Sequence, residues 1–358
     1  MTTALTWLAQ AFFLYLAATF VFDALHWALH AAHRSSSPAL RFVGAFHQTH
    51  HDFLNRSLTF DDRLVGANFW RHRTGELFTQ VAGTSLGFLF LAWQPVAATL
   101  AIFIGVFAVG VVLEGKDSNH RAQKTISAPL GSVFVGLPYH SLHHVFPDRY
   151  FGSVTTAFDR IFGTGCQIAG RRVILTGASG AFGSPMKALL EREGATVTAL
   201  PRSEFETADF STTDILVLAH GSKVDAAMHA NCDSFVALIE RFRAQRKGLV
   251  PPEVWAVGSE IECHPAFSED LKIYSASKRA FARHAHRYFH APDLIYHHIV
   301  PSAFTSPMGP GLMSGKFAAA YAWFLIKRGF RYVPVSYTGI ALVNYLKFAV
   351  LPKLKSPC

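Results

Sequence analysis

Two long stretches of the chain carry no charged side chain. The first, residues 4–22, has 19 residues, close to the roughly 20 that a helix needs to cross a bilayer. The second, residues 77–113, is too long for one crossing. Gln94-Pro95 lies near its middle, and proline interrupts a helix because it lacks an amide hydrogen. The pattern therefore predicts one membrane helix and then a helical hairpin, about three transmembrane helices in all.

The first stretch could instead be a cleaved signal peptide. Such a peptide has a basic segment before a shorter apolar run, whereas here no Lys or Arg precedes residue 4. An uncleaved helix is therefore predicted. Basic residues fill the segment between the two stretches, and both ends of the hairpin are charged, which the positive-inside rule associates with the cytoplasmic side. We expect an integral membrane protein whose histidine-rich segments and second half lie on that side.

The pattern changes after residue 165. Residues 166–170 form a short linker, and from residue 171 to about Pro301 apolar strand-like runs alternate with helical stretches. This alternation predicts a parallel sheet. The expected organisation is a membrane domain in residues 1–165 and an α/β domain in residues 171–358. Residues 317–351, which include a basic cluster at Lys327, are expected to close the α/β fold, with a place on the membrane surface as the alternative.

Composition agrees with a chain that is partly in a membrane. Half of the residues are hydrophobic, only 16% are charged, and the formal net charge is +9. Nucleic-acid binding is not expected, because no basic surface interleaved with aromatic residues is visible. The four cysteines are scattered without a CxxC pair, which argues against a disulfide framework or a zinc ribbon and favours reduced thiols.

The nineteen histidines concentrate between His26 and His144 and recur there at helical spacings. Residues three or four apart lie on one face of a helix, so each cluster presents several imidazoles to the same side. One zinc ion takes three or four ligands, whereas this many imidazoles suit two metal ions, and a nitrogen-only set beside a membrane favours iron. The candidate ligands are His26, His30, His47, His50, His51, His120, His140, His143 and His144.

These clusters resemble the three histidine boxes of the fatty acid hydroxylase / sterol desaturase superfamily, and the ending from Tyr150 to Thr164 resembles that of the same family. The resemblance covers residues 10–165. It implies an all-α membrane domain whose nine histidines hold two Fe ions at the cytosolic face and oxidise C–H bonds of lipids with dioxygen. Many members have a second histidine near His120; here water or Asn119 is left to fill that position, and His33 is a further candidate ligand.

A second set of residues lies in the α/β half. The turn from Thr176 to Gly183 follows a strand and opens a helix, as in loops that hold a pyrophosphate. Tyr274 and Lys278 lie one helical turn apart. A nearby ammonium favours tyrosinate, so the phenol could act as an acid or base near neutral pH. Ser259 ends an apolar strand, where its hydroxyl could polarise a carbonyl.

These residues resemble the short-chain dehydrogenase/reductase family, with a Rossmann-like sheet. The resemblance implies Tyr274 as proton donor or acceptor, Lys278 on the ribose, Ser259 on the substrate oxygen and Asn231 as the structural asparagine. The residues that it places on the cofactor are Thr176, Gly177, Ser179, Gly180, Gly183, Arg202, Asp209, Ala219, Gly221 and Lys278.

Two features of this half qualify the resemblance. Arg202 follows the second strand, where a basic residue favours the 2′-phosphate of NADP(H), although NAD is possible. The stretch from Arg202 to Ala219 is much shorter than usual for the family. We therefore expect a missing helix and part of a missing strand, with the sheet edge bare or covered by the membrane domain.

The two halves together predict a di-iron oxygenase that hydroxylates or desaturates a lipid (a sterol, carotenoid or acyl chain), coupled to an NADP(H)-dependent oxidoreductase. One alternative is a fatty-aldehyde-processing enzyme that resembles alkane-forming proteins, with the nucleotide-binding domain as an accessory. Another is a non-catalytic lipid-binding membrane protein. Because no flavin or iron–sulfur motif is present, a separate ferredoxin or cytochrome partner is expected to deliver single electrons.

Overall fold

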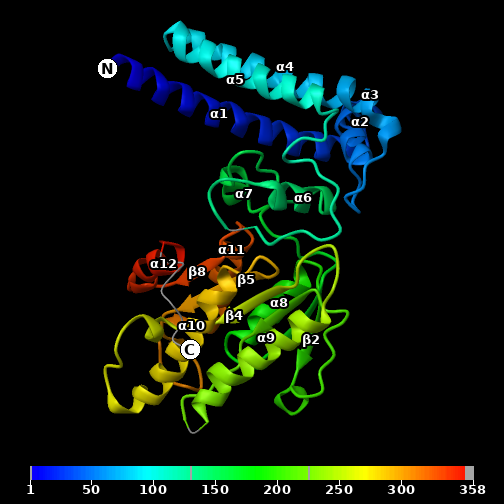
Figure 1. Ribbon diagram of the computed structural model, residues 1–358. Coiled ribbons are helices and arrows are strands. Elements are labelled where there is room, and N and C mark those ends of the chain that lie inside the picture. Colours follow the sequence, from blue (N-terminus) through cyan, green and yellow to red (C-terminus); the bar gives the residue numbers. More distant parts are fainter. Residues whose placement is uncertain (1, 130, 225, 351–358) are drawn as a thin grey trace. The chain divides into compact units, whose positions relative to one another are not determined.

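The computed structural model describes residues 2–129, 131–224 and 226–350. The chain divides into two compact units, Met1–Gly165 and Cys166–Cys358, which are described separately (Figure 1). We call them the histidine unit and the nucleotide unit.

The histidine unit is built from helices. A long first helix precedes the histidine-bearing helix α2, and a hairpin of α4 and α5 follows (Figure 1). The helices are α1 (Thr2–His33), α2 (Pro38–Phe53), α3 (Val65–Asn68), a π-helical turn η2 (Phe69–Arg73), α4 (Thr74–Ser85), α5 (Trp93–Val112), α6 (Leu137–Val145) and α7 (Ala157–Phe162). Short 3-10 turns, η1 (Asp62–Leu64) and η3 (Leu86–Leu89), connect them.

The predicted hairpin is present. Its turn lies between Leu89 and Trp93, and Pro95 stands in the first turn of α5, where its missing amide hydrogen costs no helical hydrogen bond. The helix α1 packs along α5: the Thr99 hydroxyl donates to the Ala11 carbonyl at 3.2 Å, and the rings of Tyr15 and Phe103 stack with centroids 5.0 Å apart.

Two helices, Thr3–His33 and Trp93–Val112, are long and apolar enough to cross a membrane. Only a small share of either apolar window is buried inside the protein, unlike the core helix of a soluble protein. Large apolar side chains such as Phe13, Phe78 and Val112 are exposed instead, as expected for a surface in contact with lipid. Since α4 has only 12 residues, a third span remains a prediction.

The nucleotide unit is a parallel six-stranded sheet with the order β2-β1-β3-β4-β5-β8. The strands are β1 (Arg172–Thr176), β2 (Thr196–Leu200), β3 (Ile215–Leu218), β4 (Glu253–Val257), β5 (Ile295–Pro301) and β8 (Tyr332–Val335), with a separate pair β6 (Phe304–Thr305) and β7 (Met313–Ser314). The predicted α/β Rossmann-like fold is therefore confirmed.

Helices cover both faces of this sheet. Apolar residues of α8 (Gly183–Arg192) and α11 (Gly315–Ile326) share one buried core with the sheet, and residues of α9 (Ser234–Gln245), α10 (Lys272–Phe289) and α12 (Ile340–Val350) share the other. The strands are short and apolar, with β3 buried at every position, as expected when both faces of a parallel sheet are covered.

The predicted deletion near one sheet edge is also present. Only a 3-10 turn, η4 (Arg202–Glu204), lies between β2 and β3. The strand β2 is consequently the edge of the sheet, and three of its five residues are exposed. Within the described part of the nucleotide unit, no further strand pairs with the outer side of β2, and Arg202 follows this edge strand.

The C-terminal residues close the α/β fold, as predicted. In α11, Ala318, Ala322 and Trp323 are buried, β8 pairs with β5, and Ala341 and Phe348 of α12 enter the opposite core. The sequence prediction extended to residue 351, which lies outside the described residues.

Candidate functional site

All nine predicted histidine ligands come together inside the histidine unit. They form two groups, and within each group the candidate ligand atoms lie within 4.8 Å of one another. The first group is His26, His30, His47, His51 and His143, and the second is His50, His120, His140 and His144. His33 belongs to neither group.

Helical spacing explains how the three helices α1, α2 and α6 build these groups. The i, i+4 pair His26 and His30 faces one side of α1, α2 contributes histidines to both groups, and α6 does the same through His143 and His144. Tandem histidines at the end of a helix point in different directions, so one helix can serve two metal positions. His120 alone comes from a loop.

Hydrogen bonds on the outer ring nitrogens fix how several of these imidazoles are oriented. His143 and His144 each donate from Nδ1 to a backbone carbonyl at 2.8 Å, of Arg149 and Leu54 respectively. Nδ1 of His50 lies 3.1 Å from the Asn68 amide oxygen, and Nδ1 of His120 lies 2.8 Å from the Asp117 carboxylate. These partners place the proton on Nδ1 and leave the Nε2 lone pair facing the group, as in metal-ligating histidines.

The Nε2 atoms crowd together without any intervening acid. Nε2 of His51 lies 3.2 Å from Nε2 of both His30 and His143, and Nε2 of His120 lies 3.1 Å from that of His50. Burial, with neighbouring histidines, holds the pKa of His143 and His144 well below the usual range, so both are neutral near pH 7. Neutral lone pairs that converge in a buried space fit a soft or borderline cation such as iron.

One histidine that the sequence did not single out joins this centre. His72 is buried, its ring stacks on His50, and its Nδ1 lies 3.1 Å from Nδ1 of His47. It stands in the π-helical turn η2, whose extra residue lets the consecutive side chains His72 and Arg73 both point inward. No spacing signal marks it, because no other histidine lies three or four residues from His72.

Arg73, predicted only as part of a basic loop, is also buried. Its guanidinium lies 3.1 Å from the Asp117 carboxylate, which holds His120 on its other oxygen. A Cβ on Gly110 would lie 1.7 Å from this guanidinium, so α5 leaves room for it only because residue 110 is glycine. Arg73 therefore positions the second histidine group through Asp117.

An apolar cavity of about 240 Å³ reaches the first histidine group. Its lining includes the apolar residues Phe22, Leu25, Leu29, Val43, Phe46 and Phe78, and also His26, His47, Arg71, His72 and Glu76. The cavity can hold part of a hydrocarbon chain against the two histidines that belong to the metal group.

In the nucleotide unit, the glycine turn has the geometry that its sequence predicts. Gly177 has φ +66°, and a Cβ on it would lie 2.6 Å from the Ala219 carbonyl oxygen. A Cβ on Gly183 would lie 2.0 Å from the carbonyl oxygen of Gly177. The close turn therefore requires glycine at both positions, and it delivers the chain into the N-terminus of α8, where a pyrophosphate is favoured.

A groove of about 850 Å³ runs along this turn. Of the predicted cofactor residues, Gly177, Ser179, Arg202 and Gly221 line the groove. Gly180 and Gly183 shape the turn, and Thr176 donates from its hydroxyl to the Val217 carbonyl at 3.3 Å. Ala219 lines the adjoining pocket. Asp209 is exposed, binds Ser211 and does not line the groove.

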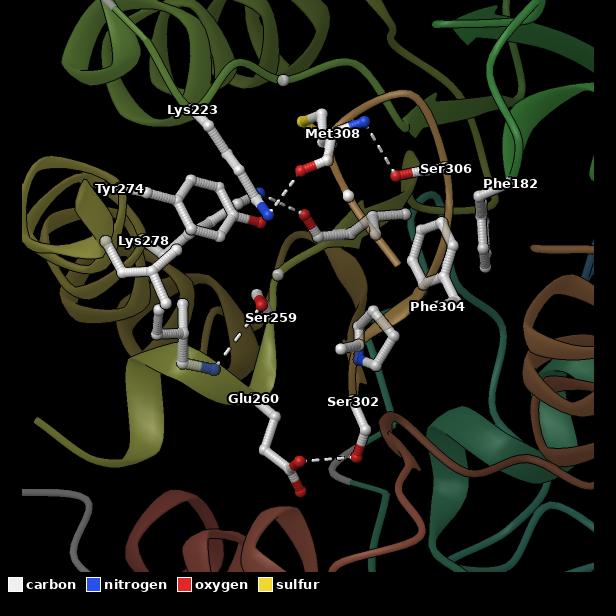
Figure 2. Close-up of a pocket in the computed structure, with 18 of the residues that line it drawn as sticks. Phe182, Lys223, Ser259, Glu260, Tyr274, Lys278, Ser302, Phe304, Ser306 and Met308 are labelled. Carbon is white, nitrogen blue, oxygen red and sulfur yellow. Dashed lines mark hydrogen bonds between the residues drawn. The ribbon is translucent and has the colours of Figure 1, made fainter. Parts of the chain in front are cut away.

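The predicted catalytic residues line one pocket of about 400 Å³ beside this groove (Figure 2). Ser259 caps the 3-10 turn η6 (Glu260–Cys263), and Tyr274 and Lys278 project from α10. The Lys278 ammonium donates to the Val257 carbonyl at 2.9 Å, and burial lowers its pKa to about 8. Figure 2 shows Lys223 next to the Tyr274 ring, with its ammonium 5.8 Å from the ring centroid.

One electrostatic prediction was wrong in this structure. Burial raises the pKa of Tyr274 above its usual value, and a hydrogen bond from Ser259 offsets this only in part. The Lys278 ammonium lies 6.0 Å from the ring centroid and is itself engaged with a backbone carbonyl. Tyr274 is therefore a phenol near neutral pH and is set to donate a proton.

Asn231 acts as a structural asparagine. It lies in the π-helical turn η5 (His229–Asp233) and donates from its amide to the Ser222 carbonyl at 2.6 Å and to the Ser277 hydroxyl at 3.0 Å. It thereby links the loop that follows β3, at Ser222, to the helix α10, which carries Ser277 and Tyr274. Since Asn231 also lines the pocket that holds Ser259 and Tyr274, this link sets the position of the pocket wall.

His220, which follows the strand β3, makes a second link. Its Nδ1 lies 2.7 Å from the Thr176 hydroxyl and its Nε2 lies 2.9 Å from the Ser234 hydroxyl. Its ring packs between Phe205 and Phe235, and burial lowers its pKa to about 3. His220 lines both the groove and the pocket, so it joins the nucleotide and substrate sites.

The parallel sheet, the glycine turn and the Ser–Tyr–Lys set define the second unit as a nucleotide-binding unit of the short-chain dehydrogenase fold. The first unit is helical, with apolar helices and two buried histidine groups. Together they fit a sterol desaturase-like unit fused to a short-chain dehydrogenase unit.

Comparison with known proteins agrees with this architecture. Monoglucosyldiacylglycerol epimerase from Synechocystis is 26% identical over 290 residues, which cover 69% of this chain and 70% of that protein. This share is larger than either unit, so the match extends into both. No family model matches the chain.

Solved structures similar to the nucleotide unit are short-chain dehydrogenases. One from Burkholderia cenocepacia in complex with NADP is 16% identical, with a TM-score of 0.41, and covers 52% of this chain and 96% of its own. One from Sphingobium yanoikuyae in complex with NADPH is 14% identical, with a TM-score of 0.40, and covers 52% of this chain and 98% of its own.

Proposed function

We propose that this protein is a membrane lipid oxidoreductase with two active sites, a di-iron centre in the histidine unit and an NADP(H)-dependent site in the nucleotide unit. The observation that carries the proposal is the pair of histidine groups, the first of which reaches an apolar cavity through His26 and His47. A structural histidine core would have no need of nine imidazoles that converge in two groups.

The histidine unit would hold two Fe ions, one in each group. Bound iron supplies the activation of dioxygen needed for attack on an unactivated C–H bond. The chain's own contribution is orientation. Carbonyls of Arg149 and Leu54 hold His143 and His144, and the Asp117 carboxylate holds His120.

The apolar cavity supports a lipid substrate. Its wall of Phe, Leu and Val side chains excludes water and would align a hydrocarbon segment with His26 and His47. The exposed apolar faces of α1 and α5 support an integral membrane location, with the histidine groups and the nucleotide unit on the cytoplasmic side. Hydroxylation and desaturation both begin at such a C–H bond.

In the nucleotide unit, a bound nicotinamide would supply or accept a hydride at the substrate carbon. Ser259 would hydrogen-bond the substrate oxygen, and Tyr274 would donate a proton to it from Oη or take one back. Lys278, now held by the Val257 carbonyl, would turn toward the ribose. The exposed groove beside Arg202 accommodates an adenosine 2′-phosphate, which supports NADP(H).

The relative from Synechocystis favours a second candidate function, epimerisation of a sugar hydroxyl in a glycolipid head group. A bound nicotinamide would take the hydride from the carbinol carbon while a base takes the proton from its hydroxyl oxygen. Return of the hydride to the opposite face of the resulting carbonyl, and of the proton to its oxygen, leaves the composition unchanged, so no external oxidant is consumed. The 400 Å³ pocket beside Tyr274 has room for a single hexose. This candidate uses the nucleotide unit for the whole reaction.

The di-iron reaction needs a separate electron donor of the ferredoxin or cytochrome type. A hydride carries two electrons together, and the sequence holds no flavin or iron–sulfur motif that could pass them on one at a time. Full turnover of purified protein with only NADPH and dioxygen would contradict this part of the proposal.

The first experiment is a lipid profile of cells that express the wild type, His144→Ala or Tyr274→Phe. The two-site proposal predicts that the wild type makes a lipid product with one more oxygen or two fewer hydrogens. This product should be absent in His144→Ala. If the first step is hydroxylation, its alcohol should accumulate in Tyr274→Phe. Epimerisation predicts instead a glycolipid of unchanged mass, lost in Tyr274→Phe. If both variants match the wild type while the purified protein contains iron, neither site acts on lipids of that host.

A further inference from the structure

The net positive charge of the chain is concentrated at its C-terminal end. After Asp293 no Asp or Glu occurs up to residue 358, whereas Lys and Arg occur seven times and so provide seven of the nine net charges. The described part of this acid-free segment forms α11, β8 and α12. A segment so one-sided in charge favours an anionic partner.

The helix α11 is apolar on two opposite faces. Ala318, Ala322 and Ile326 are fully buried in the core of the nucleotide unit. On the other face Phe317, Tyr321 and Phe324 are 57%, 39% and 42% exposed. A helix that only closes the fold would have polar side chains on its second face.

The exposed aromatic rings form a continuous ladder. Phe317 and Tyr321 stack with centroids 6.0 Å apart and planes inclined by 8°, and Tyr321 and Phe324 stack at 5.9 Å and 11°. The Arg328 guanidinium lies 3.6 Å from the centroid of Phe324 and continues the ladder. Basic side chains therefore meet the aromatic surface directly.

Lys316 stands at the start of this ladder, and Lys327 and Arg328 stand at its end, with no acidic residue in α11. We call Lys316, Phe317, Tyr321, Phe324, Lys327 and Arg328 the α11 outer face. We propose that this face docks on an anionic bilayer surface, with the aromatic ladder at the headgroup level and the basic residues on lipid phosphates.

Two arguments favour lipid as the occupant. Aromatic side chains flanked by basic residues are typical of a membrane interface. The same chain also carries two helices that are long and apolar enough to cross a membrane. A second copy of the chain is less suitable, because a two-fold contact through this face would oppose like charges. The docking does not depend on the reaction of either site.

The test uses the full chain in lipid vesicles. Cys263 and Cys358 are replaced by Ser, which leaves only the buried Cys166 and Cys232. Tyr321→Cys is then labelled with an environment-sensitive fluorophore. The matched control is Glu206→Cys, whose native side chain is 90% exposed. Vesicles of phosphatidylcholine with or without phosphatidylglycerol carry spin-labelled lipid as a quencher, and a Lys316/Lys327/Arg328→Gln variant tests the charge.

The proposal predicts blue-shifted emission at position 321, quenched by spin-labelled lipid at least about twofold more than at position 206. It also predicts stronger quenching with phosphatidylglycerol, and loss of that increase in the triple Gln variant. Equal, water-like emission at both positions would overturn it. Blue-shifted emission that spin-labelled lipid does not quench would mean that protein covers this face, and this result would also overturn the proposal. If that emission then depends on the density of the protein in the vesicles, the covering protein is a second copy.

Discussion

The imidazole rings of His50 and His72 lie face to face, with centroids 4.0 Å apart and planes inclined by 19°. His50 belongs to the second histidine group and His47, whose Nδ1 meets Nδ1 of His72, to the first. His72 thus touches both groups from the outside, while its Nε2 lies 3.8 Å from the Glu76 carboxylate. This position suits a residue that orients ligands rather than one that binds the metal.

We predict that His72→Ala weakens iron binding by about 10- to 100-fold, as the loss of a residue behind a metal ligand usually does. His47 would lose the partner of its Nδ1, and its ring could rotate away from the first group. Iron per chain, measured by mass spectrometry after dialysis against a weak chelator, checks this.

His33→Ala is the matched control, because His33 lies on α1 near the ligands but in neither group. It should retain the iron content of the wild type, and His144→Ala should lose more iron than His72→Ala. If His72→Ala and His33→Ala bind iron equally well, His72 has no part in the centre.

The histidine boxes were predictable because spacing within a single helix determines which of its histidines lie close together. Spacings of three and four residues place His140, His143 and His144 on adjoining faces of one helix whatever surrounds it. His72 has no such neighbour; it reaches the centre only because a π-helical turn rotates it inward against α2. That contact is tertiary, so the spacing of histidines along the sequence could not reveal it.

In the nucleotide unit, too, local patterns were predictable from the sequence and tertiary contacts were not. The glycine turn and the Tyr274–Lys278 pair follow from spacing along one strand, turn or helix. The pKa of Tyr274 was predicted with the wrong sign because it depends on burial, which the whole pocket determines. The sequence assigned no role to His220, since its bonds to Thr176 and Ser234 join segments far apart in the chain.

A second prediction concerns Asp159, near the end of the histidine unit. This buried carboxylate accepts hydrogen bonds from the backbone amides of Phe151 and Gly152, at 2.9 and 2.8 Å, and from the hydroxyls of Tyr139 and Thr164. Asp159→Ala would leave these donors without an acceptor, so it should lower the free energy of unfolding by about 3 kcal/mol.

Thermal unfolding in detergent, followed by tryptophan fluorescence, checks this second prediction. Asp148→Ala is the control: Asp148 pairs with Arg34 where both side chains are about half exposed, and such pairs contribute roughly 0–1 kcal/mol. Equal melting temperatures for the two variants would show that the Asp159 network does not stabilise the unit.

A third prediction concerns acid stability through His220. Its pKa is lowered to about 3 in the folded protein, mainly by burial, so below the ordinary value of about 6.5 the unfolded chain binds a proton that the folded chain does not. The stability linked to this residue is therefore fully present above about pH 6.5 and falls as the pH decreases toward 3.

We expect His220→Asn, which cannot titrate, to reduce the difference in melting temperature of the nucleotide unit between pH 7.5 and pH 5. NADPH fluorescence reports whether the groove is still formed. His264→Asn is a suitable control, because His264 is a partly exposed histidine of the same unit whose ring bonds only the neighbouring Pro265 carbonyl. An unchanged pH difference in His220→Asn would mean that other groups cause the acid sensitivity.

The last prediction concerns the choice of nucleotide. Arg202 follows β2 and lines the groove, and the deletion between β2 and β3 leaves this side of the groove without a covering helix. Its guanidinium can reach a 2′-phosphate, so Arg202→Ala should weaken NADPH binding about tenfold, the loss of one charge-assisted contact, and leave NADH binding nearly unchanged. Arg192→Ala, at the far end of α8, should alter neither. Titration of each variant with both nucleotides, read by nicotinamide fluorescence, gives the ratio of the two dissociation constants directly.

If NADH binding falls as much as NADPH binding in Arg202→Ala, Arg202 supports the shape of the groove and does not select the 2′-phosphate. If wild type binds NADH more tightly than NADPH, the assignment of NADP(H) is wrong.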